Sequence, residues 1–178
     1  MKYLKLLSLI VTVFILGNRQ TANAQNWQIG KNYTIEFVSS DVSGIFKELK
    51  GTIVFNEQSL AASKFVVSVP VSSINTGNAL MNTHTKDAEW FDSATYPLIT
   101  FKSKRIVKSG AGFLATGNLT IHGVTKEVSV PFTFKQSGNS GTFTGSFSIV
   151  RSEYKVGKPG GDVTENFKIN LSIPVTKI

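Results

Sequence analysis

The sequence predicts an all-β protein, an antiparallel lipocalin-like barrel of about eight strands with a short helical insert at about residues 75–92. Apolar residues alternate with Ser, Thr, Lys and Asn through most of the chain after residue 25, and turn-forming stretches separate these runs. One face of nearly every expected strand is therefore apolar and the other polar. Such strands enclose a single apolar interior when they close on themselves, and closure also removes edges that invite aggregation.

The clearest strands lie in the second half of the chain, in "EVSVPFTF" (127–134), "TFTGSFSIV" (142–150) and "FKINLSIPV" (167–175). Weaker alternation occurs at 33–37, 65–69, 99–101 and 119–121. Pro70, Pro131 and Pro174 fall on the outward phase, where each removes a donor from the hydrogen-bond ladder. We therefore expect bulges or an open seam somewhere in the barrel wall.

The inward phases carry many phenylalanines, and two interpretations of them stay open. The rings could fill a solid core, or they could line an apolar tunnel beneath the insert. The tunnel interpretation assigns to its wall Phe37, Phe65, Val67, Phe101, Val130, Phe132, Phe143, Phe147, Phe167, Ile169 and Leu171. No ionisable residue shares these phases in the best strands, so a long apolar ligand would meet no polar competition.

The insert, "NTGNALMNTHTKDAEWFD", is the one segment without alternation. At helical spacing Leu80, His84, Ala88 and Phe91 share one stripe, which predicts one or two short helices ending before Tyr96. A helix in a small barrel lies across its wall or mouth. We assign to the tunnel mouth Leu80, His84, Trp90 and Phe91.

Residues 1–24 have the pattern of a cleaved secretory signal. Lys2 and Lys5 precede an apolar run, and "ANA" at 22–24 supplies small residues for cleavage after Ala24. The apolar run is short for a membrane span, although an uncleaved anchor is the alternative. Cleavage leaves residues 25–178 as one domain, and we expect a periplasmic or secreted location.

Charge and cysteine content exclude several classes of function. The net charge is +8, of which Lys2, Lys5 and Arg19 lie in the leader, so the mature chain carries +5. The basic residues are scattered rather than clustered, which argues against nucleic-acid binding but leaves weak, transient contact with a membrane surface open. The absence of cysteine excludes a thiolate nucleophile, a cysteine-based zinc site and a lipidated cysteine.

The two histidines are candidates for catalytic or metal-binding groups. His122 lies between Ile121 and Gly123, where one strand ends and another begins, and it lacks an orienting carboxylate. We interpret it as a hairpin corner rather than a base. His84 and Asp87 could share a metal, but two ligands do not make a site, so we expect none.

Several stretches, in the same order along the chain, resemble the YceI-like family. They are "SGIFKELKGTIVF" (43–55), "INTGN" (74–78), "EWFDSATYPLITFKS" (89–103), "GNLTIHGVTKEVSV" (117–130) and "RSEYK" (151–155). The last stretch matches an Arg-x-acid-aromatic motif, with Lys155 where glycine is common. The resemblance implies an extended lipocalin-like barrel that binds polyisoprenoid or other long-chain lipids.

Some positions depart from the family pattern. The first strand region, "IGKNYTIEF", lacks an Asp and a His-Ser pair, and Met81 and Asn82 replace an Arg-Asp pair before His84. Thr85 stands where the family has Leu. A polar cluster near the mouth is thus depleted, which leaves the identity of the ligand open.

The predicted function is that of an exported, soluble, non-enzymatic protein that holds a long-chain isoprenoid or similar lipid as carrier or reservoir. A quinone is a further candidate ligand, no cofactor is expected, and dimerisation stays open. The alternatives are a filled adhesion or structural module and, with less support, an enzyme that acts on an apolar substrate.

Overall fold

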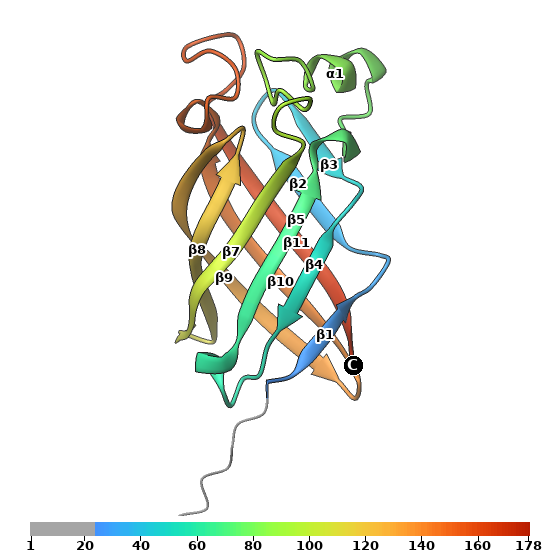
Figure 1. The fold of residues 1–178 in the computed structure, drawn as a ribbon, viewed down its shortest axis with the longest axis vertical. Helices are drawn as coiled ribbons and strands as arrows, with labels where there is room; N and C mark the ends of the chain where they lie inside the picture. The colour runs from blue at the N-terminus through green and yellow to red at the C-terminus, as the bar shows by residue number, and fades with distance from the viewer. Residues whose placement is uncertain (1–23) are drawn as a thin grey trace, which may run out of the picture.

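The computed structural model describes residues 24–178 as one antiparallel barrel (Figure 1). The predicted signal in 1–24 lies, except for Ala24, outside the described residues. The strands are β1 (Asn26–Ile29), β2 (Thr34–Val38), β3 (Ser43–Phe46), β4 (Lys50–Val54), β5 (Lys64–Pro70), β6 (Ile74–Asn75), β7 (Leu98–Ser109), β8 (Gly112–Ile121), β9 (Val124–Ser137), β10 (Ser140–Val150) and β11 (Asn166–Lys177). One α-helix, α1 (Ala79–His84), and three short 3₁₀ helices, η1 (Leu60–Ala62), η2 (Val71–Ser73) and η3 (Arg151–Tyr154), join them.

The strands close a ring in the order β1-β4-β5-β7-β8-β9-β10-β11, and β11 pairs back onto β1. Nearer the α1 end, β2 replaces β1 as the neighbour of β11, because the chain bends away from β11 between the two. Strands β3 and β6 continue the wall from β2. The wall therefore has eight strand positions, and the prediction of a closed antiparallel barrel is confirmed.

The expectation of an irregular wall is also confirmed. The pairing of β7 with β8 shifts register between Ser103 and Arg105. Pairing of β9 with β10 runs from Ser137 and Ser140 only as far as Phe132 and Gly145. Beyond that point β9 pairs with β8, and β10 pairs with β11. Pro131, which has no backbone N–H, is the first residue of β9 past the last pair.

The insert contains less helix than predicted. Helix α1 ends at His84, so the stripe expected to extend to Ala88 and Phe91 was wrong. After α1 the chain folds into overlapping turns, in which the Phe91 amide donates to the Thr85 carbonyl and the Ser93 amide to the Lys86 carbonyl. A helix this short is not stable by itself, so tertiary contacts decide the path of the segment. Within residues 24–178, no helix combines the length and the apolar character needed to cross a membrane.

The end of the barrel opposite α1 is filled by aromatic rings, which we call the aromatic floor. Phe55 is its centre, 1% exposed, with five other rings at centroid distances between 5.0 and 6.1 Å. The indole Nε1 of Trp27 donates to the Phe55 carbonyl at 2.9 Å, so this buried polar group is satisfied. The aromatic floor consists of Trp27, Phe55, Phe65, Phe113, Phe132, Phe134 and Phe143.

Candidate functional site

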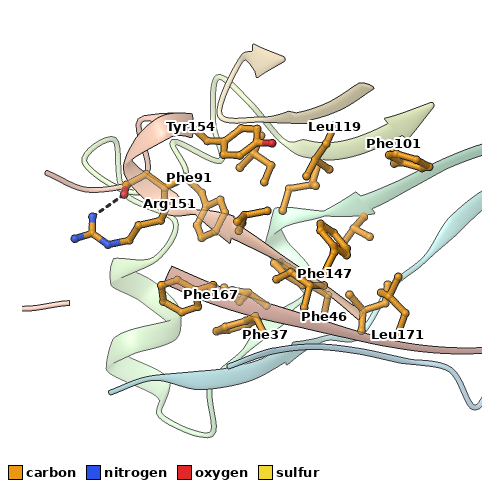
Figure 2. A pocket seen from close by; sticks show the side chains of 18 of the residues that line it. Phe37, Phe46, Phe91, Phe101, Leu119, Phe147, Arg151, Tyr154, Phe167 and Leu171 are labelled. Atoms are coloured by element: carbon orange, nitrogen blue, oxygen red, sulfur yellow. Dashed lines mark hydrogen bonds between the residues drawn. The ribbon is translucent and has the colours of Figure 1, made fainter. Parts of the chain in front are cut away.

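An apolar cavity of about 650 Å³ lies between the aromatic floor and the α1 end of the barrel. Phe65, Phe132 and Phe143 form its base, and aliphatic and aromatic side chains from the strands form its wall. Apart from the amphipathic rings of Trp90 and Tyr154, its polar side chains are confined to the mouth: Asn78, His84, Thr85 and Arg151. Figure 2 shows the wall residues converging on this space from opposite strands.

The structure brings all the residues predicted for the tunnel wall to this one cavity. Each of the eleven, from Phe37 in β2 to Leu171 in β11, lies on its lining. The four mouth residues do so as well, with Leu80 67% exposed at the rim. Because strand parity fixes which face a side chain occupies, the strand residues could be identified without knowledge of the barrel.

Other lining residues were missed because their segments are short or irregular. Val42, Phe46, Leu49 and Ile74 come from β3, β6 and their connections, where alternation is too brief to read. The Gly44-x-Phe46 motif was the sequence feature that could have indicated a lining residue in β3. A Cβ on Gly44 would lie 2.5 Å from the ring of Phe37, so glycine lets that ring lie against β3.

The turns that follow α1 cover the cavity mouth with two aromatic rings. Phe91 meets Phe46 edge to face, with ring centroids 6.5 Å apart. Trp90 lies beneath the guanidinium of Arg151, at 5.6 Å from the ring centroid. Gly157 packs against both, since a Cβ there would lie 2.7 Å from Arg151 Nη1 and 2.8 Å from the indole. The insert and the loop after η3 are thus joined above the cavity.

Arg151 organises the loop after η3, and sequence reasoning did not assign it this role. Its side chain is 4% exposed, and its guanidinium makes four hydrogen bonds to backbone carbonyls and one ion pair with Glu165. Nε donates to the Thr164 carbonyl and Nη2 to Val163. Nη1 donates to the carbonyls of Val156 and Lys158, at 2.9 and 3.0 Å, and Nη2 forms an ion pair with the Glu165 carboxylate at 2.8 Å. These contacts hold the loop of residues 156–165 in place, so the role of Arg151 is structural.

A second polar contact fastens the same loop to the turn between β2 and β3. The carboxylate of Asp41 accepts hydrogen bonds from the backbone amide of Thr164, at 2.8 Å, and from its hydroxyl. Hydrogen bonds from the Thr164 hydroxyl and from Ser40 hold the pKa of Asp41 below its usual range. The mouth is therefore held by polar contacts, whereas the floor is held by packed rings.

His122 forms the corner of the β8–β9 hairpin, as interpreted from the sequence. His122 and Gly123 both have positive φ, 47° and 72°, which matches a two-residue turn of type I′. The His122 ring nitrogen Nδ1 is 2.7 Å from the Lys155 carbonyl oxygen, and Tyr96 packs edge-on at 5.0 Å. These contacts connect the hairpin to η3 and to the insert.

His84 and Asp87 do form a pair, with Nδ1 and Oδ2 3.3 Å apart, but both side chains are more than half exposed. In the described part of the chain no three His, Cys, Asp or Glu side chains gather in a way that could hold a metal ion. The pair lies at the rim of the cavity and its geometry is that of a surface ion pair.

The fold and the cavity define this molecule as a lipocalin-like binding barrel. A family model for the YceI-like domain matches residues 21–175. The chain belongs to the YceI-like family.

Curated relatives agree with this placement. Protein YceI of Salmonella newport is 37% identical over 100 residues, which cover 56% of this chain and 52% of that protein. The chain thus spans about half the length of this relative. A UPF0312 protein of Yersinia pestis is 27% identical over 178 residues, covering 94% of this chain and 93% of that protein.

Solved structures share the barrel. Burkholderia cenocepacia BcnA superposes with a TM-score of 0.80 at 28% identity, covering 84% of this chain and 100% of that chain. A polyisoprenoid binding domain from Saccharophagus degradans gives a TM-score of 0.63 at 14% identity, over 87% of this chain and 99% of that chain. At this identity the second likeness concerns the fold alone.

Proposed function

We propose that this protein is an exported carrier or reservoir for a long-chain isoprenoid or similar lipid, and that it acts by binding rather than by catalysis. The apolar cavity carries the proposal. Its volume of about 650 Å³ falls within the range of small-molecule sites. The Saccharophagus degradans polyisoprenoid binding domain, which shares the fold, is a precedent for this ligand class in such a barrel.

The energetics favour a chain of methylene or isoprene units. Each CH₂ group buried in an apolar wall contributes about 0.8 kcal/mol. Immobilising the ligand and the side chains around it subtracts part of this gain. Several isoprene units therefore bind without a charged anchor, which fits a wall whose polar side chains are confined to the mouth.

The test is mass spectrometry of organic extracts from gently purified protein, followed by reconstitution with a polyprenyl lipid. We expect a co-purifying long-chain lipid and binding at micromolar concentrations or below. Protein that carries no lipid and binds none at micromolar concentrations contradicts the proposal. N-terminal sequencing of the protein recovered after export tests cleavage, and a chain that still begins at Met1 contradicts it.

We further propose that the mouth meets a lipid surface transiently when ligand is loaded. Leu80 and Met81 are 67% and 37% exposed at the rim, where they also line the cavity. The mouth segments 39–42, 76–97 and 151–165 contain more acids than bases, namely Asp41, Asp87, Glu89, Asp92, Glu153, Asp162 and Glu165 against Lys86, Arg151, Lys155 and Lys158. Contact at the mouth is therefore apolar rather than driven by anionic lipid.

Lipid transfer from vesicles tests this contact. Leu80→Ser with Met81→Ser should slow transfer from neutral phosphatidylcholine vesicles, while a higher fraction of anionic lipid should not speed transfer to the unmodified protein. Unchanged transfer by the double variant argues against a loading surface at α1.

A further inference from the structure

Tyr154 presents a polar group inside the apolar half of the barrel. The residue ends η3, is 2% exposed, and packs with Leu119, Ile121 and Val156. This packing fixes the ring against β8. A buried tyrosine hydroxyl ordinarily finds a hydrogen-bond partner, since leaving one unmade in an apolar environment is unfavourable.

No described residue supplies a hydrogen bond to this hydroxyl. At the same time, no side-chain polar atom of residues 24–178 is both sealed from solvent and without a partner. The hydroxyl therefore belongs to the small part of Tyr154 that reaches open space, and Tyr154 lines the cavity. Figure 2 shows its oxygen on the side of the ring toward Leu119, pointing away from Arg151.

The hydroxyl is a neutral donor. Burial, and then the nearby charge of Glu153, raise the pKa of Tyr154 above its usual value, so the phenol keeps its proton at neutral pH. The two cations nearest to it among the described residues already have partners. Arg151 donates to four carbonyls and pairs with Glu165, and Lys126, whose Nζ lies 6.0 Å from the centroid of the Tyr154 ring, pairs with Glu153. His84 lies at the exposed rim beside Asp87. The inner wall thus offers a donor without positive charge.

We propose that Tyr154 is the specificity anchor of the cavity, donating a hydrogen bond to an uncharged oxygen acceptor on the bound lipid. This inference rests on the proposed function. An isoprenoid alcohol and an isoprenoid with a carbonyl head share the required acceptor. A polyprenyl phosphate instead brings charge to a wall whose guanidinium, that of Arg151, is already bonded to loop carbonyls and to Glu165, and such burial is unfavourable. In the "RSEYK" stretch, a phenylalanine at this position would fill similar space but donate nothing.

Four probes with the same geranylgeranyl chain separate these cases: the alcohol, a quinone, the phosphate and the hydrocarbon. Wild-type protein should bind the alcohol and the quinone more tightly than the phosphate. Tyr154→Phe should weaken the alcohol and the quinone by about two- to tenfold, the value of one hydrogen bond, and leave the hydrocarbon unchanged. Tyr96→Phe, which alters a partly exposed tyrosine near His122, is the matched control and should change none of the four.

The outcomes that overturn the inference differ from those that overturn the proposed function. The inference is wrong if wild type and Tyr154→Phe bind the alcohol and the quinone with equal affinity. It is also wrong if Tyr154→Phe weakens binding of the hydrocarbon as much as binding of the alcohol and the quinone. Tightest binding of the phosphate also contradicts it. If wild-type protein binds none of the probes, the proposed function itself fails. A second readout does not depend on a variant: with ¹³Cζ-labelled tyrosine, the Tyr154 resonance should shift with the alcohol and the quinone but not with the hydrocarbon.

Discussion

The two ends of the barrel are built from the same alternating strands and differ in what fills them. At the closed end, Phe55 and six other aromatic side chains occupy the space between β1, β4, β5, β8, β9 and β10. At the α1 end, the inward side chains stand apart around a cavity of about 650 Å³. Strand pattern alone is common to both ends, so side-chain size and placement decide between core and cavity.

The two ends also differ in the interactions that stabilise them. An empty apolar space lacks the dispersion contacts of a packed interior, and it therefore destabilises the fold that contains it. The aromatic floor concentrates large buried surface at the other end, where T-shaped and offset pairs add to the burial. Polar contacts through Arg151 and Asp41, rather than packed rings, hold the loop over the mouth.

The largest expected effect is on the floor. Phe55→Ala should lower the free energy of unfolding by about 3–5 kcal/mol, because it opens a hole at the centre of the packed rings. Phe147→Ala removes the same side chain from the cavity wall, where space already exists, and should cost less than about half of that. Denaturant titration measures both. Equal losses would mean that the two ends are not energetically distinct.

Lipid binding should depend on the cavity wall. Phe147→Glu places a carboxylate in an apolar wall and should weaken lipid binding more than about 100-fold, because a buried charge without a partner is costly. Ser148→Glu puts the same charge on the exposed face of β10 and serves as the control. Circular dichroism verifies the fold, and tracer displacement measures affinity. Retained affinity in a folded Phe147→Glu variant would place the ligand outside the cavity.

The loop over the mouth should loosen without disturbing the floor. Arg151→Lys keeps the charge but supplies three donors in place of five, so carbonyls of the loop lose partners. We expect a local loss of about 1–3 kcal/mol, seen as faster hydrogen exchange in residues 156–164. Exchange around Phe55 should stay as in wild type. Faster exchange in the floor as well would show that the two ends unfold as one unit.

The smallest effect concerns pH. Because the pKa of Asp41 is lowered in the folded protein, its contribution to holding the loop is complete above the usual aspartate pKa of about 3.9 and disappears as pH falls through the lowered value. The hydrogen-exchange protection factor of the Thr164 amide should therefore fall at acidic pH. Asp41→Asn should remove this dependence, whereas Asp162→Asn on the same loop should keep it. Protection that does not change with pH in wild type contradicts the role of Asp41.

Much of the wall was predictable because strand geometry is local. Successive side chains point to opposite faces, so Phe143, Phe147 and Phe167 could be assigned to the interior from parity alone. The hairpin corner at His122 followed from the adjacent glycine and the flanking strands. The insert was harder, since a six-residue helix followed by turns is set by contacts with distant segments rather than by its own propensity.

Alternation by itself determined that this chain has apolar strand faces, which positions lie on them and where the strands turn, because these properties repeat at short range along the chain. Tertiary structure decided which inward residues meet. Phe143 packs against the other rings of the floor, whereas Phe147, on the same face of β10, lies outside that cluster and lines the cavity wall. It also decided that the Arg151 guanidinium is bonded to the loop, whereas the Tyr154 hydroxyl has no hydrogen-bond partner among the described residues. Such differences depend on side chains brought together from strands distant in sequence, and no local pattern records those distances.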